Sequence, residues 1–116
     1  MIGNDCTGDL TALMQVVDIS GIDDNWVTGK IRGTNLTVQM KVFSESSTFG
    51  IGDGRISKMS IYNDADRQTK GFFGACEMNY DRGWDIKPAT DEAFERCQVI
   101  VNALGAKMDI RRKKVK

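Results

Sequence analysis

The sequence contains no histidine, and this absence restricts its chemistry more than any other feature. Histidine is the commonest general base, the usual partner of a nucleophilic serine or cysteine, and a frequent ligand of zinc and iron. Catalysis would have to depend on carboxylates, lysine, arginine or tyrosine, and no catalytic motif built from these residue types is present. We therefore expect a protein that is not an enzyme and that binds no metal or cofactor.

Cysteines are few and long apolar runs are missing. The three cysteines, Cys6, Cys76 and Cys97, are odd in number and far apart, which predicts free thiols in a reducing compartment and not a disulfide frame or a zinc site.

No segment approaches the roughly 20 apolar residues that a membrane-spanning helix needs. The polar N-terminal sequence MIGNDCTGDL does not resemble a signal peptide. These absences predict a cytoplasmic protein without membrane contact.

The formal net charge is zero, but the charges are unevenly distributed. Residues 107–116 contain six of the sixteen cationic side chains and one acid, Asp109, so they carry +5 and leave −5 on residues 1–106. A chain of 116 residues has the length of one domain that buries a core without disulfides or metals. We therefore expect one domain over residues 1–106, followed by a basic tail over residues 107–116.

Apolar spacing predicts a helix near each end of this domain. Within residues 8–20, apolar side chains recur at the spacing of one helix face (Leu10, Leu13, Met14, Val17). The β-branched residues Val16, Val17 and Ile19 leave a strand as the alternative for the second half of this segment. A second helix begins after Thr90, a favoured N-cap residue, and ends at Gly105. Its apolar stripe is suited to packing on a sheet (Phe94, Cys97, Ile100, Val101, Leu104).

Between the predicted helices the apolar period is two, which is typical of strands. Residues 26–32 and 36–42 alternate and predict a hairpin, and residues 55–62 predict a third strand in which Ile56 and Met59 are out of phase, as at a β-bulge. Residues 63–71 are interpreted as a polar turn and residues 72–80 as a fourth strand. The predicted fold class is α+β: a four- or five-stranded antiparallel meander sheet with an N-terminal and a C-terminal helix packed on one face.

Two motifs have a structural and a functional interpretation. The loop Gly50–Gly54 resembles a phosphate-binding glycine loop, but a strand follows it where such loops need a helix, so we interpret it as a flexible hairpin turn. The segment NYDRGWD, residues 79–85, predicts a hairpin loop at Asp81–Gly83, with Gly83 at positive φ and Asp81 and Asp85 on either side of Arg82. The same segment is also a candidate partner-binding hot spot (Tyr80, Asp81, Arg82, Trp84, Asp85).

An alternative binding site consists of cationic residues. Arg55 and Lys58 beside the glycine loop, together with tail residues, are candidate ligands of phosphate or nucleic acid (Arg111, Arg112, Lys113, Lys114). The acidic charge of residues 1–106 argues against a nucleic-acid groove on the folded domain. It suits a partner with a basic surface, such as a nucleic-acid-binding enzyme.

Several motifs together resemble a family of small uncharacterised proteins that bacteriophages and bacterial mobile elements encode. They are Trp26-x-x-Gly29, STFGIGDGRISKM over residues 47–59, NYDRGWDIKP over residues 79–88, and the closing amphipathic helix. The resemblance covers residues 25–104 and implies a small accessory protein that acts in the cytoplasm of a bacterial host cell.

The sequence and this resemblance lead to two functional hypotheses. The first is a phage or mobile-element protein that binds a host protein stoichiometrically and so inhibits a bacterial defence system. Its partner would be a bacterial host protein, such as a nucleic-acid-binding defence enzyme. The alternative is a protein that binds nucleic acid or a nucleotide signal. A concave basic patch on the folded domain would favour the alternative.

Deletion of residues 111–116 tests whether the basic run belongs to the packed domain. We expect the melting temperature to stay nearly unchanged, because a run of like charges is solvated and not buried. Thermal unfolding followed by circular dichroism measures this. A loss of more than ~2 kcal/mol would show that the segment is packed as part of the fold.

Overall fold

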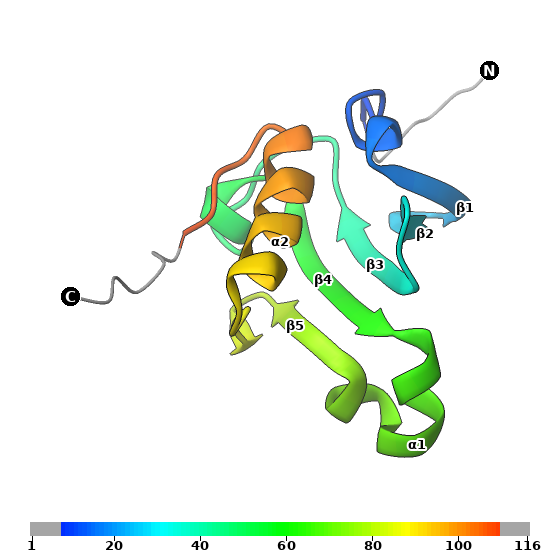
Figure 1. Ribbon diagram of the computed structural model, residues 1–116. Coiled ribbons are helices and arrows are strands. Elements are labelled where there is room, and N and C mark those ends of the chain that lie inside the picture. The colour runs from blue at the N-terminus through cyan, green and yellow to red at the C-terminus, as the bar shows by residue number, and fades with distance from the viewer. Residues whose placement is uncertain (1–7, 110–116) are drawn as a thin grey trace.

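Six antiparallel strands, each hydrogen-bonded to the next strand in the chain, form a single sheet. The computed structural model of the chain describes residues 8–109, and Figure 1 shows the arrangement of the elements. In chain order these are η1 (Leu13–Gln15), β1 (Val17–Asp23), β2 (Trp26–Ile31), β3 (Leu36–Val42), η2 (Ile51–Asp53), β4 (Ile56–Asn63), α1 (Asp64–Ala75), β5 (Cys76–Asp81), β6 (Trp84–Ile86) and α2 (Asp91–Ala103). The predicted α+β class is confirmed, but the sheet has six strands and not four or five.

The helix predicted over residues 8–20 is wrong. Leu13–Gln15 form only one turn of 3-10 helix, and Val17–Asp23 form strand β1. Strand β1 pairs with β2, with Val17 opposite Ile31. The apolar spacing came from residues of two different elements, and β-branched side chains favour the extended conformation here (Val16, Val17, Ile19).

The turn predicted at residues 63–71 is wrong, because Asp64–Ala75 form helix α1. The side chain of Asn63 accepts a hydrogen bond from the backbone N–H of Asp66 at 3.1 Å, which caps the helix. Gly71, at φ +76°, interrupts the helical geometry near its end. The strand predicted from residue 72 therefore begins only at Cys76.

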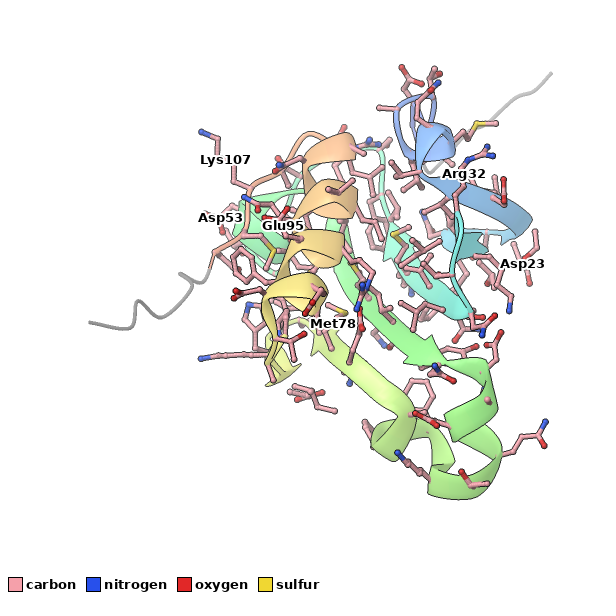
Figure 2. All side chains as sticks on the ribbon, viewed as in Figure 1. Asp23, Arg32, Asp53, Met78, Glu95 and Lys107 are labelled. Carbon is pink, nitrogen blue, oxygen red and sulfur yellow. The ribbon has the colours of Figure 1, made fainter. Side chains whose placement is uncertain are left out.

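The predicted C-terminal helix is confirmed as α2. The hydroxyl of Thr90 accepts a hydrogen bond from the N–H of Ala93 at 3.1 Å, and Gly105 follows the helix at φ +80°. Helix α2 covers one face of β4 and β5 (Figure 1). Met78 of β5, labelled in Figure 2, belongs to the same buried cluster as the apolar side chains of α2 (Cys97, Ile100, Val101, Leu104). No helix in the described range is long and apolar enough to cross a membrane.

The β-bulge predicted in β4 is confirmed and lies at Ser57. Lys41 of β3 pairs with Lys58, whereas the next residue, Val42, pairs with Ile56, so Ser57 is an inserted residue. Ile56 and Met59 are three positions apart and both fully buried. A regular strand would point them to opposite faces, so the burial of both requires the extra residue.

The loop that precedes β4 is closely packed, although the sequence suggested a flexible turn. A Cβ atom on Gly50 would lie 2.1 Å from the carbonyl oxygen of Gly54, and one on Gly52 would lie 1.9 Å from that of Lys107. Between these glycines, Ile51 is fully buried. Figure 2 shows Asp53 of this loop and Lys107 at the same end of the molecule. The glycines therefore allow two backbone segments to approach each other.

Asp109 joins this loop to the hairpin between β5 and β6. One carboxylate oxygen accepts a hydrogen bond from the indole N–H of Trp84 at 2.7 Å, and the other accepts one from the N–H of Gly52 at 3.0 Å. Asp109 falls within the range predicted as the basic tail, yet residues 107–109 contact the domain. Residues 110–116 lie outside the described part, so the tail beyond Asp109 stays a prediction.

The prediction that Gly83 has a positive φ is wrong. Arg82 lies in the left-handed region, at φ +56°, and Gly83 does not. The N–H of Arg82 donates to the carbonyl of Ser57 at 2.9 Å, and the N–H of Asp81 donates to that of Gly83 at 2.8 Å. The turn therefore docks on the β4 bulge through Arg82.

Two glycine-to-alanine substitutions compare these two turns. Gly52→Ala should destabilise the protein by more than ~2 kcal/mol, because alanine is strained at φ +60° and its Cβ would clash with the Lys107 carbonyl. Gly83→Ala is the matched control and should change the free energy of unfolding by less than ~1 kcal/mol, since no atom lies within 4 Å of its added Cβ. Urea unfolding measures both, and equal losses would contradict the described loop packing.

Candidate ligand-binding groove

The two faces of the sheet carry different side chains. The apolar cluster and α2 occupy one face. On the opposite face, which we call the open face, the pairing register aligns one residue from each of four strands in a row: Trp26, Lys41, Lys58 and Asp81. The next row along the strands is polar and uncharged: Thr28, Gln39, Ser60 and Asn79. One end of the open face therefore carries two opposed lysines, an exposed indole and Asp81.

Lys41 and Lys58 are directly opposite each other across β3 and β4. Like charges at such positions destabilise a sheet. The ammonium of Lys58 lies 3.7 Å from a carboxylate oxygen of Asp81, whereas that of Lys41 lies over aromatic rings, 6.0 Å from the centre of Trp26 and 5.7 Å from that of Phe43. Each lysine thus has a partner that offsets part of the repulsion, and a local departure from stable pairing of this kind occurs at functional sites.

A groove of about 350 Å³ continues from these lysines toward the loop before β4. Four cationic and two aromatic side chains contribute to its lining: Lys41, Phe43, Phe49, Arg55, Lys58 and Arg82. None of the residues that line it between positions 8 and 109 is acidic. The groove therefore combines positive charge with aromatic surface, although residues 1–106 are acidic as a whole.

Hydrogen bonds within the domain hold the loop side of the groove. The hydroxyl of Tyr80 donates to the carbonyl of Phe49 at 2.9 Å, and the Oγ of Ser47 accepts a hydrogen bond from the N–H of Phe49 at 3.0 Å. Burial, together with the nearby Asp109 and Asp53 carboxylates, raises the pKa of Tyr80 above its ordinary value, so the phenol stays protonated and remains a donor. The ring of Phe49 itself is 59% exposed.

Arg82 and Lys58 line the side of the groove formed by the hairpin and β4. The side chain of Arg82 is 65% exposed, and its Nε lies 3.8 Å from a carboxylate oxygen of Asp81. Asp81 thus faces two cations, at 3.7 Å and 3.8 Å. Interactions of this length at an exposed site contribute little to stability, so both cations are available to an anionic ligand.

Arg55, the second phosphate-binding candidate, is directed mainly at the protein backbone. Its guanidinium donates to the carbonyls of Leu104 at 3.4 Å, Phe43 at 3.4 Å and Asp9 at 3.2 Å. These contacts connect the N-terminal segment, the end of α2 and the end of β3. A stabilising role is therefore evident from the contacts, whereas phosphate binding by Arg55 stays a prediction.

The hot spot predicted in NYDRGWD is only partly exposed. Tyr80 is 4% exposed, and its ring meets that of Trp84 edge-to-face at 5.1 Å between centroids. The two residues are paired across β5 and β6. Asp85 accepts a hydrogen bond from the side chain of Asn79 at 3.2 Å and does not hold Arg82 as expected. Among the predicted contact residues, Asp81, Arg82 and Asp85 are exposed, Tyr80 is buried in the apolar cluster, and Trp84 is half-buried against it.

The aromatic residues beside the groove and Lys41 were not among the site residues predicted from the sequence. The tail candidates lie outside the described residues (Arg111, Arg112, Lys113, Lys114). Trp26, Lys41 and Phe43 had one signal in the sequence, because they occupy the polar phase of the predicted hairpin, where a tryptophan and a phenylalanine are unusual. Phe49 had none, since its position depends on the folding of the loop.

Comparisons with known proteins identify a family and nothing beyond it. A family model described as a domain of unknown function, DUF7678, matches residues 25–105. No curated protein and no solved structure matches the chain. The matched range includes every groove residue named above and begins at the turn before β2.

Reversing the charge of Lys41 tests whether the lysine pair is unfavourable. Lys41→Glu should keep the fold and raise its stability by about 0.2–1 kcal/mol, because it replaces a like-charge pair by an opposite-charge pair across the strands. Thermal unfolding at low and high salt measures this, and the gain should shrink at high salt. Lys87→Glu, at another exposed lysine, is the control, and an equal gain there would contradict the argument.

Proposed function

We propose that this chain, which belongs to the DUF7678 family of domains of unknown function, binds nucleic acid in the groove at the edge of its open face. Lys41, Lys58 and Arg82 would contact phosphate oxygens, and the exposed aromatic rings beside them would contact bases. Binding requires no catalytic group, in agreement with the expectation that the protein is not an enzyme.

The opposed pair Lys41 and Lys58 supports this proposal most directly. The two lysines are opposite each other on neighbouring strands and both line the groove, so a phosphate bound there would receive positive charge from both strands. Phosphodiester groups supply such charges at regular intervals, and neutralising them releases counterions. The site thus favours a ligand with several anionic groups.

The aromatic side chains favour nucleic acid over other anions. Trp26 is 40%, Phe43 36% and Phe49 59% exposed, and all three lie close to cationic side chains. Base faces stack on such rings with little regard to sequence, while the cations contact the backbone. An acidic peptide could use the cations, but it would leave these apolar surfaces unused.

The hypothesis of a protein that blocks a bacterial defence system stays a prediction. It depends on the resemblance to phage and mobile-element proteins, and of the two aromatic residues in its proposed contact surface Tyr80 is buried and Trp84 is half-buried. The criterion stated for the alternative, a concave basic patch on the folded domain, is met by the groove lining. For this reason nucleic-acid binding is the function we propose.

Titration with fluorescent oligonucleotides tests the proposal. Wild type should raise the anisotropy of a labelled oligothymidylate, and the logarithm of the affinity should fall linearly with the logarithm of salt concentration. Lys41→Ala, Lys58→Ala and Arg82→Ala should each weaken binding and lower the slope by about one, because each removes one phosphate contact.

Two controls make the titration decisive. Lys87→Ala removes an exposed lysine that does not line the groove and should leave the slope unchanged. Poly-glutamate supplies negative charge without bases and should bind at least tenfold more weakly than the oligonucleotide. No binding of nucleic acid, or equal binding of poly-glutamate, would overturn the proposed function.

A further inference from the structure

A second cluster of aromatic and cationic side chains lies where α1 meets β4. The guanidinium of Arg67 lies 4.9 Å from the ring centre of Tyr62 and 5.4 Å from that of Phe72. The rings of Tyr62 and Phe72 meet edge-to-face at 5.5 Å, and Phe73 meets Phe72 at 5.2 Å. We call these residues the α1 cluster.

The conformation of α1 places an aromatic ring on the surface of this cluster. Tyr62 is 5% exposed beneath its neighbours, whereas Phe73 is 63% exposed. Gly71 adopts φ +76° and ψ 178°, which only glycine adopts readily, and so redirects the chain before the two phenylalanines. A phenylalanine with this exposure contributes little to the core, although it is large enough to cover a base.

The α1 cluster and the groove lie along the same strand. Lys58, Ser60 and Tyr62 alternate on β4, and the pairing of β3 with β4 is regular between Lys58 and Tyr62. They therefore point to the same side of the sheet. Four residues of a strand span about 13 Å, so this is the approximate separation between the groove lysines and the α1 cluster. Figure 1 shows α1 at the far end of β4 from the loop that carries η2.

The surface between the two clusters is suited to a polar chain. It consists of uncharged side chains that offer donors and acceptors, Gln39 and Ser60 among them. The acids near the α1 cluster have cationic neighbours, because Asp64 pairs with Lys30 and Asp66 lies 3.6 Å from Lys70. An anionic ligand that passes along β4 would therefore meet compensated carboxylates at this end.

We infer that the open face binds a single strand of nucleic acid along β4, with one base stacked near Trp26 and Phe43 and a later base stacked on Phe73 beside Arg67. This inference rests on the proposed function and adds the strandedness and length of the ligand. A separation of about 13 Å corresponds to roughly four stacked bases. A ligand of that length or longer would reach both clusters.

A duplex cannot use this surface in the same way. Its bases are stacked on one another and their faces are covered, so exposed aromatic rings have no partner on a closed helix. Only the phosphates would bind, at the lysines and Arg82. Selectivity for single strands and a dependence on length therefore follow from the positions of the rings.

Binding of labelled oligothymidylates of about 3 and about 8 nucleotides to the full chain tests the inference by fluorescence anisotropy. Phe73→Ala should weaken binding of the longer oligonucleotide by about fivefold or more and should leave the shorter one unchanged, since the shorter one occupies the groove alone. Trp26→Ala should weaken both. Phe73→Tyr keeps an aromatic face and should retain wild-type affinity.

Val99→Ala is the matched control, because Val99 is an exposed apolar residue (43%) on α2; it should bind like wild type. Circular dichroism checks that each variant is folded. The inference would be overturned if wild type bound a blunt duplex as tightly as a single strand, or if Phe73→Ala bound the longer oligonucleotide as tightly as wild type does. In either case, weaker binding by Lys58→Ala would still support nucleic-acid binding in the groove. Absence of binding by wild type would instead overturn the proposed function, and the inference with it.

Discussion

The β-bulge at Ser57 is the constraint on which the groove depends. Ile56 and Met59 are both fully buried although they are three positions apart in one strand, and only an inserted residue makes this compatible with the pleat. The insertion places Lys58 on the open face opposite Lys41. It also leaves the carbonyl of Ser57 to accept the N–H of Arg82. The apolar core thereby determines where the cations meet.

Hydrogen bonds around this bulge hold the loop and the hairpin on either side of the groove without using the side chains of Lys41, Lys58 and Arg82. Asp109 holds Trp84 and the N–H of Gly52, and the hydroxyl of Tyr80 holds the carbonyl of Phe49. The groove residues themselves have weak partners, at 3.7 Å and 3.8 Å from a single carboxylate oxygen in the case of Lys58 and Arg82. Support and ligand contact are therefore assigned to different residues, which is the arrangement that preorganises a binding site.

Local signals in the sequence were sufficient wherever neighbours in the chain determine the structure. The hairpin of β2 and β3 followed from alternation, the bulge from the phase of Ile56 and Met59, and α2 from the cap Thr90 and the stop at Gly105. Local signals were insufficient where residues distant in the sequence determine the conformation. Strand β1 forms because β2 offers it hydrogen bonds, and the αL position fell on Arg82 because the hairpin docks on β4. For α1, the cap Asn63 was a local signal, but the phenylalanines at 72 and 73 suggested a strand.

The sequence by itself determined the α+β class, the order of most elements, the absence of histidine chemistry and the uneven distribution of charge. It also contained the cations Lys58 and Arg82 as candidates. Only the tertiary structure decided that they meet Lys41 and three exposed aromatic rings, because these residues lie on β2, β3, β4 and two loops. The pairing register between strands decides which of these side chains become neighbours. That register depends on the burial of all the side chains in the sheet together. For this reason residues 1–106, which are acidic as a whole, form a basic groove that their composition did not indicate.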